Sequence, residues 1–229
     1  MRIWDIHPAY LNRQSLLGEH RELHGIVSII LHGKKGYANH PETKRWVDYG
    51  WALRQRHKLL ASEMALRGFT DKSPVTMNSN PNLWPEIYID TPNLQFQLLK
   101  NKYRNKEQGR IPLPENPQQL WHHHQYSVLA RDAKLYQEIG RDLCKAKIDF
   151  YELAMLVTKI LRQQPSNDGV KRAIQHMWRD IPDKEVDNAF DIDSRSPHNW
   201  LLAIQKMATT QNIPQLTTTT SLSELIAWL

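Results

Sequence analysis

The first 24 residues, MRIWDIHPAYLNRQSLLGEHRELH, contain the groups best suited to covalent chemistry. They hold the α-amine of Met1, the neighbouring Arg2, and an Arg21–Glu22 pair that enters an apolar run. An α-amine has an ordinary pKa of about 7.7–8.0, against about 10.4 for lysine, so more of it is neutral near pH 7. A neutral amine beside a carboxylate is what Schiff-base chemistry on a sugar aldehyde requires. Sequence spacing alone does not bring Met1 and Glu22 together.

The carboxylate of Glu22 lies on a predicted helix over residues 11–31. Asn12 is a candidate N-cap, and Gly33 ends the run. Gly18 and Glu22 are four residues apart and share a face, so the glycine could leave a hollow beside the carboxylate. The apolar residues at helical spacing are Leu16, Leu17, Leu23, Ile26, Val27, Ile30 and Leu31.

A loop over residues 32–46, HGKKGYANHPETKRW, mixes basic and aromatic side chains. Lys34, Lys35 and His40 lie in it, with Tyr37 close by. Groups mixed in this way can hold phosphates and stack on bases. They are equally typical of a polar helix connection with a few anchoring aromatics, and the pattern does not decide between the two.

The rest of the chain predicts an all-α fold without a strand. Residues 70–92 are expected to form a long ordered loop, and the proline-rich GRIPLPENP at 109–117 is the best domain boundary. The basic residues near the end of the third helix are explained by the helix dipole without a ligand, although they would also suit a phosphate backbone; they are Lys100, Lys102, Arg104 and Lys106. Further helices are expected at 42–66, 93–106, 118–131, 133–146, 149–163, 168–180, 197–209 and 220–228.

The charge is concentrated in one half of the chain. The protein has 229 residues and a net charge of +6, and residues 1–115 hold 17 Lys and Arg against 11 Asp and Glu. The remaining half is neutral overall. A positive half of this kind is a plausible footprint for nucleic acid, although many basic proteins merely carry solvated lysines.

Several features point to a cytoplasmic protein without a membrane partner. No segment approaches the roughly 20 apolar residues of a membrane span. Asp5, His7 and Pro8 stand where a signal peptide would have its apolar core, so we do not expect secretion. The single cysteine, Cys144, excludes an internal disulfide and fits a reducing compartment.

Three consecutive histidines, His122, His123 and His124, are the most visible candidate for a metal site. Consecutive residues of a helix point in different directions, and no paired cysteines or spaced carboxylate–histidine motif accompany them. We therefore favour a structural or solvent-facing role for these histidines and expect neither a metal nor a cofactor.

The N-terminal stretch resembles the pyrimidine-dimer DNA glycosylases, the endonuclease V type first known from a bacteriophage. The resemblance covers roughly the first 105 residues and keeps order and spacing over the first 24. Later parts of it are Tyr37-x-x-His40-Pro41 and the block from Leu53 to Phe69. The residues that carry it at the start are Arg2-Ile3, His7-Pro8, Tyr10-Leu11, Gln14, Leu16 and Glu19-x-Arg21-Glu22-Leu23.

This resemblance implies a helical, cofactor-free glycosylase that is also an abasic-site lyase. Carried over, the Met1 amine attacks C1′ of the damaged nucleotide, and Glu22 stabilises the cationic sugar and assists β-elimination. Arg2 and Arg21 would hold phosphates, and Gln14 would lie at the DNA surface. Such an enzyme must flip a nucleotide out of the duplex.

We therefore expect an endonuclease V-like domain over residues 1–112, packed with a helical domain of unknown role over 113–229. The second half weakly resembles an uncharacterised bacterial helical family, which implies no chemistry. The expected partner is double-stranded DNA that carries a damaged base or an abasic site. Two alternatives remain, a nucleic-acid-binding module that has lost catalysis and a partner-binding protein whose C-terminal helices matter most.

Overall fold

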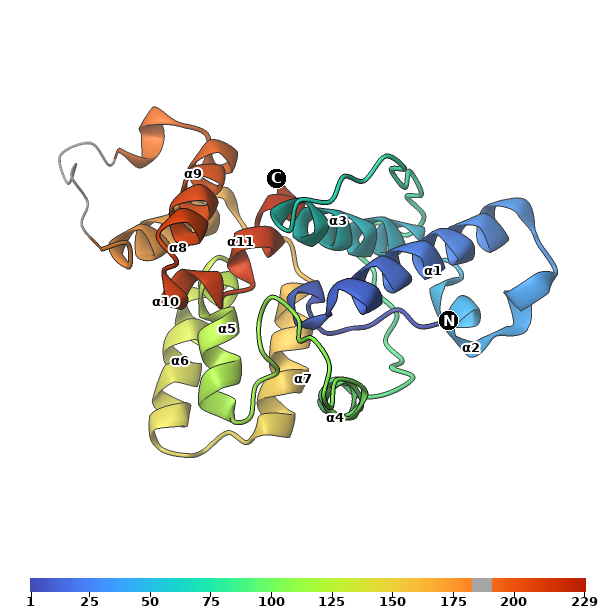
Figure 1. The fold of residues 1–229 in the computed structure, drawn as a ribbon, viewed down its shortest axis with the longest axis horizontal. Coiled ribbons are helices and arrows are strands. Elements are labelled where there is room, and N and C mark those ends of the chain that lie inside the picture. The colour runs from blue at the N-terminus through green and yellow to red at the C-terminus, as the bar shows by residue number, and fades with distance from the viewer. Residues whose placement is uncertain (183–190) are drawn as a thin grey trace. The chain divides into compact units, whose positions relative to one another are not determined.

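The protein is described here by a computed structural model that covers residues 1–182 and 191–229. Within these residues the chain is helical and contains no strand, which confirms the all-α prediction (Figure 1). It divides into an N-terminal unit, Met1–Gly109, and a C-terminal unit, Arg110–Leu229. Among the described residues, no helix combines the length and the apolar character that crossing a membrane would need.

The N-terminal unit is built around α1, which begins and ends where the sequence predicts. The Asn12 side chain accepts a hydrogen bond from the Ser15 backbone N–H at 2.9 Å, and Gly33 closes the helix with a φ of 58°. Leu16, Leu23 and Ile26 turn inward, and α1 packs on α3. The helices of this unit are η1 (Pro8–Tyr10), α1 (Arg13–His32), η2 (Gly36–Asn39), α2 (Pro41–Trp46), α3 (Gly50–Leu66) and α4 (Pro92–Lys102).

The single long helix predicted over residues 42–66 is wrong, because the chain breaks between α2 and α3. Val47 is extended, and Asp48 adopts a left-handed φ of 69°. The loop after α3 stabilises the new helix start. Ser79 accepts hydrogen bonds from the N–H groups of Gly50 and Trp51, at 2.9 and 3.0 Å. The apolar pattern runs through the break, so periodicity could not reveal it.

The third predicted helix, residues 93–106, ends early as α4 at Lys102. Tyr103 is buried there, and its hydroxyl accepts a hydrogen bond from the Asn12 backbone N–H at 3.0 Å. Arg104 and Lys106 therefore lie beyond the end of the helix, although the prediction placed both within it. The predicted loop before α4 is confirmed, since residues 69–91 form neither helix nor strand.

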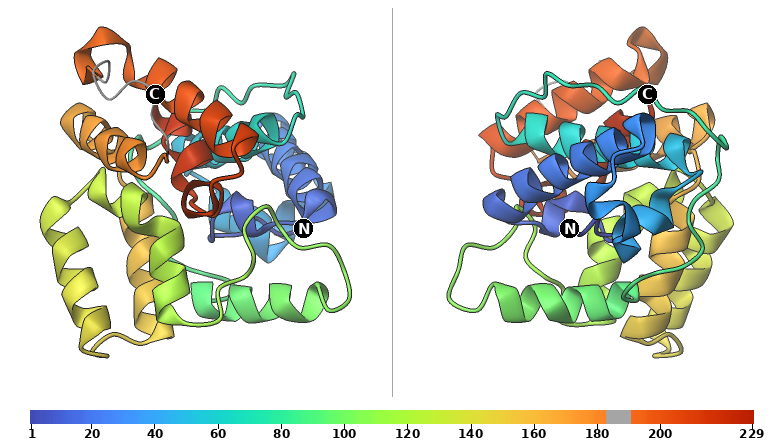
Figure 2. Two further views of the ribbon diagram at one scale, coloured as in Figure 1. Left: turned by 60° about the vertical axis from the view of Figure 1, so that its left-hand side comes forward. Right: turned by 90° about the vertical axis from the view of Figure 1, so that its right-hand side faces the viewer.

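In the C-terminal unit, α5 contacts α6, α7, α8 and α11 (Figure 2). Five predicted helices are confirmed within a few residues of their predicted ends. The sixth, over 220–228, is divided into two short helices, α11 and η5, and the four-residue helix α10 before it was not predicted. The helices are α5 (Pro117–Leu129), α6 (Ala133–Cys144), α7 (Phe150–Leu161), α8 (Asn167–Arg179), η4 (Ile192–Ser194), α9 (Pro197–Thr210), α10 (Pro214–Thr217), α11 (Ser221–Glu224) and η5 (Ile226–Trp228).

A buried ion pair holds residues 1–11, the N-terminal segment, against α1 and α3. Arg56 donates to both carboxylate oxygens of Glu19, at 2.7 and 2.9 Å, and to the Ile6 carbonyl at 2.9 Å. Glu19 also accepts from the Trp4 backbone N–H at 3.2 Å. Burial raises the pKa of Glu19, and the Arg56 guanidinium opposes that rise. One pair thus fixes two points of the segment.

Other side chains complete the attachment of the segment, which runs antiparallel to α1 (Figure 1). Arg45 on α2 donates to the Ile3 carbonyl at 3.0 Å and to Asp5 at 2.8 Å. Arg67, just after α3, donates to the carbonyls of Leu11 and Ala9, at 2.7 and 3.1 Å. Gln95 on α4 accepts from the Asp5 N–H at 2.8 Å. Every helix from α1 to α4 therefore helps to position the N-terminus.

We predict that Arg56→Met destabilises the protein by about 3–5 kcal/mol, because it leaves the Glu19 carboxylate buried without its partner. Arg54→Met on the same helix is the matched control. Within the described part of the chain, Arg54 bonds to Asn78 in an exposed pair, at 2.7 Å, so its loss is expected to cost less than about 1 kcal/mol. Urea unfolding followed by circular dichroism measures both, and equal losses would contradict the role given to Arg56.

A second prediction concerns the contact of α8 with the end of α5. A Cβ added at Gly169 would lie 1.9 Å from the Ala130 carbonyl oxygen, whereas one added at Gly140 meets nothing within 4 Å. Gly169→Ala should therefore lower the midpoint of urea unfolding. Gly140→Ala should raise it through a helix propensity gain of about 0.5–1 kcal/mol. A stabilising Gly169→Ala would show that the two helices are not in close contact.

Candidate active site at the N-terminus

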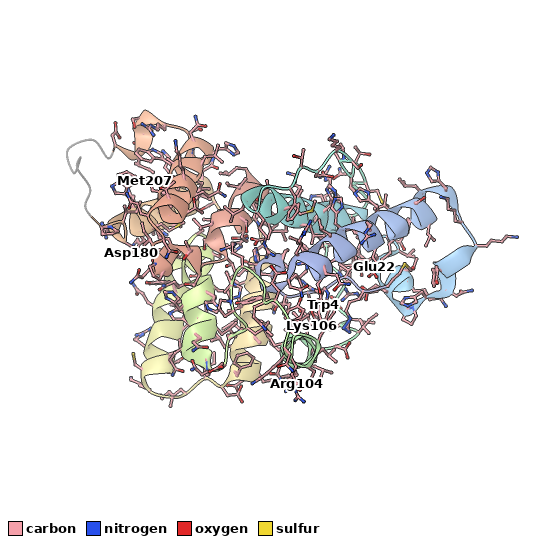
Figure 3. The ribbon with its side chains drawn as sticks, viewed as in Figure 1. Trp4, Glu22, Arg104, Lys106, Asp180 and Met207 are labelled. Carbon is pink, nitrogen blue, oxygen red and sulfur yellow. The ribbon has the colours of Figure 1, made fainter. Side chains whose placement is uncertain are left out.

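The predicted carboxylate lies against the N-terminal backbone. Glu22 Oε2 accepts a hydrogen bond from the Arg2 backbone N–H at 2.5 Å. The Met1 amine is joined to that amide nitrogen through only two intervening atoms, which places it within about 6 Å of the same oxygen. Glu22 is half-buried on α1, with Trp4 of the N-terminal segment nearby in Figure 3. Two groups 21 positions apart are thus brought to one place.

The Arg2 side chain is paired rather than free. It forms an ion pair with Asp90 in the loop before α4, and its guanidinium lies 4.7 Å from the centre of the Trp4 ring. Both partners of the ion pair are about a quarter exposed. Burial lowers the pKa of Arg2 below its ordinary value, which the nearby Glu42 carboxylate opposes. Asp90 could not be identified from the sequence, because no local pattern links residue 90 to residue 2.

Two of the predicted DNA-binding residues share one exposed face of α1. Gln14 and Arg21 are seven positions apart and both exposed, and Gly18 and Gly25 lie between and beside them on that face. A Cβ added at either glycine would meet nothing within 4 Å. The space beside Glu22 that Gly18 was expected to leave is therefore open. We call the surface formed by Gln14, Gly18, Arg21 and Gly25 the glycine face.

The basic loop continues from the end of this helix. Lys34 donates to Ser28 on α1 at 2.7 Å, and Lys35 is exposed. His40 is half-buried, and its Nδ1 accepts the Glu42 backbone N–H at 3.1 Å, so His40 caps α2. Its ring also lies edge-on to Tyr37, with ring centres 6.2 Å apart. The two lysines are presented to solvent, whereas His40 has a clear structural task.

The three consecutive histidines of α5 have structural contacts in the C-terminal unit. His124 Nδ1 lies 3.1 Å from the Thr220 hydroxyl, and His122 Nε2 lies 3.2 Å from Thr218. Burial lowers the pKa of His123 to about 4, with His122 and Arg110 adding to the effect. Among the described residues, none of the three belongs to a group that could hold a metal ion.

One group with metal-ligand character was missed by the sequence analysis. His20 and His24 on α1, His57 on α3 and Asp71 in the following loop offer ligand atoms that all lie within 4.8 Å of one another. Burial lowers the pKa of His57 to about 4, opposed by the Asp71 carboxylate. The spacing of His20 and His24, four residues apart on a predicted helix, was the available signal. The third and fourth members come from distant segments.

Comparison with known proteins gives a match in the part of the chain that holds Glu22. No curated protein and no solved structure matches the chain. The likeness of the C-terminal half to a bacterial helical family stays a prediction. Residues 1–77, which include α1, α2 and α3, match the family model described as pyrimidine dimer DNA glycosylase. The predicted resemblance is therefore confirmed for the N-terminal part of the chain, and it supports a DNA repair glycosylase in general.

Proposed function

We propose that the N-terminal unit is a DNA glycosylase with abasic-site lyase activity, in which the Met1 amine is the nucleophile and Glu22 the acidic catalyst. The observation that carries this proposal is the 2.5 Å hydrogen bond from the Arg2 N–H to Glu22 Oε2. It lies within the family-matched residues and holds a carboxylate next to the terminal amine. An amine alone, or a surface glutamate alone, would support no reaction.

In the proposed reaction the amine nitrogen bonds to C1′ as the N-glycosidic bond breaks. The base departs with the bonding electron pair and takes up a proton. The sugar ring then opens at O4′, which accepts a proton, and the nitrogen and C1′ form an imine. Removal of a C2′ proton expels the 3′ phosphate and cuts the strand. Glu22 stabilises the cationic sugar and carries protons between these positions.

The attachment of residues 1–11 supports this assignment. A nucleophile gains from being held in place, because positioning replaces part of the entropy lost in reaching the transition state. Here, the backbone N–H groups of Arg2 and Trp4 donate to Glu22 and Glu19, which lie one helical turn apart on α1. The amine is therefore attached to a segment with little freedom to move away from the carboxylate.

For the substrate we propose double-stranded DNA with a damaged base or an abasic site, bound along α1. The glycine face allows a close approach of a DNA backbone beside Glu22, since Gly18 and Gly25 carry no side chain and a Cβ at either would meet no described atom within 4 Å. In this proposal Arg21, Lys34 and Lys35 contact phosphates, and Gln14 lies at the DNA surface. The Arg2 guanidinium and His40 also contact DNA in this proposal. Arg2 does so while paired with Asp90, and His40 while capping the start of α2.

We predict that Glu22→Gln lowers strand cleavage at an abasic site by at least about 100-fold, with DNA affinity largely unchanged. A glutamine oxygen can still accept the hydrogen bond from the Arg2 N–H, so the geometry is retained while the charge is lost. The assay uses a duplex with one defined abasic site and the protein with a native, untagged N-terminus. Glu86→Gln, at an exposed loop position of the same unit, is the control and should cleave normally.

The same assay tests the amine. Borohydride added during the reaction reduces an imine to a stable amine, so the untagged protein should become covalently attached to the DNA strand. Acetylation of the N-terminus should abolish both the adduct and the cleavage. No adduct from the untagged protein would reject the Schiff-base mechanism, and retained DNA binding in that case would favour the non-catalytic module. Loss of binding even at low salt would favour the partner-binding protein.

A further prediction concerns the basic loop. The double variant Lys34→Gln, Lys35→Gln should bind DNA more weakly at all sequences and lower the slope of log affinity against log salt by about 2, one for each lost phosphate contact. Lys58→Gln, on an exposed part of α3, is the matched control and should change neither quantity. Fluorescence anisotropy over a salt series measures both. An unchanged slope would remove the two lysines from the DNA interface.

A further inference from the structure

A second group of reactive side chains lies on the opposite side of α1 from Glu22. His20 and His24 are one helical turn apart and point to the same side, and Glu22, halfway between them in sequence, points about 180° away. His57 of α3 and Asp71 of the following loop complete the group. Three imidazoles and one carboxylate are thus gathered from three separate segments within the N-terminal unit.

The spacing within this group is close to that of a tetrahedral metal site. The four ligand atoms lie within 4.8 Å of one another, and His20 Nε2 is 3.2 Å from Asp71 Oδ1. His57 Nε2 is 3.5 Å from Asp71 Oδ2. Ligands about 2.0–2.1 Å from a zinc ion are separated from one another by about 3.3–3.5 Å in a tetrahedron, so small side-chain shifts suffice.

Two of the ring nitrogens are buried without a hydrogen bond. Among the described residues, neither His24 Nε2 nor His57 Nε2 has a hydrogen-bond partner, and the Asp71 carboxylate lies 3.5 Å from His57 Nε2, at ion-pair distance. The rings also crowd each other, with centres 4.6 Å apart for His20 and His24 and 4.9 Å apart for His24 and His57. Buried polar atoms normally have partners. Two buried nitrogens without hydrogen bonds, gathered within 4.8 Å of a third imidazole and a carboxylate, are an arrangement that suits a bound cation.

We propose that His20, His24, His57 and Asp71 bind one first-row transition-metal ion of the Zn²⁺ class. Imidazole and carboxylate ligands suit Zn²⁺, and four protein ligands close the site as in structural zinc centres. The ion joins α1, α3 and the loop after α3 from the side that does not carry Glu22. It acts as a structural link that fixes α1, and it takes no part in the chemistry at Met1.

The test uses the full chain, purified without a histidine tag, stripped with EDTA and titrated with ZnCl₂. We expect one Zn²⁺ per chain with a Kd below about 1 μM, and a rise of several degrees in the temperature of thermal unfolding. Co²⁺ in place of Zn²⁺ should give the intense visible absorption of a tetrahedral centre. Less than one tenth of an ion bound per chain would overturn the proposal.

Substitutions then locate the site. His24→Gln and Asp71→Asn should each weaken Zn²⁺ binding at least about 10-fold, and circular dichroism before metal addition checks that they fold. His32→Gln, at the exposed end of the same helix, is the control and should bind like the unchanged chain. Equal affinities of His24→Gln and His32→Gln would also overturn the proposal, and so would a Co²⁺ spectrum that His24→Gln leaves unchanged.

This inference is independent of the proposed function. Borohydride trapping on abasic DNA depends on the Met1 amine, whereas the Zn²⁺ titration requires no DNA. A chain that binds Zn²⁺ without forming an adduct would keep the metal site and reject the lyase. A chain that forms the adduct without binding Zn²⁺ would support the lyase and reject the metal site.

Discussion

The N-terminal unit depends on one buried ion pair, Glu19 with Arg56. A carboxylate and a guanidinium that are both removed from water are tolerable only when all their hydrogen bonds are satisfied. Here the remaining bonds go to the backbone of the N-terminal segment, at Trp4 and Ile6. The two backbone hydrogen bonds that complete the pair therefore also hold the segment. Arg45 and Arg67 extend this arrangement along the chain.

This arrangement explains which parts of the fold the sequence could predict. Helices with a local signal were predicted well: α1 has Asn12 at its start and Gly33 at its end, and both adopt the expected conformations. The break at Asp48 was missed because its cause lies 31 residues later, in the Ser79 contacts that start α3. The early end of α4 has a similar cause, since Tyr103 bonds to Asn12 across 91 positions.

The residues of the candidate site divide in the same way, into those with a local signal in the sequence and those placed by distant segments. Met1 and Glu22 were proposed from chemistry and resemblance, Gln14 and Arg21 from the resemblance, and Gly18 from its position one helical turn before Glu22. Their shared face follows from helical periodicity, so local sequence was sufficient. The pairing of Asp90 with Arg2 depends on how a distant loop folds back towards the N-terminus. The same is true of Asp71, the fourth member of the histidine group, whose loop folds back onto α1. No rule of sequence spacing relates residues that lie so far apart in the chain.

The glycine face affects the stability of the protein apart from any ligand. Alanine at Gly18 or Gly25 would meet no neighbouring atom, and each change would favour α1 by about 1 kcal/mol through helix propensity alone. The folded chain thus retains two residues that weaken its longest helix without a packing reason. Such positions are where stability and activity are traded against each other. The two glycines lower the stability of the free protein. Any gain from them arises only when another molecule lies against this part of α1.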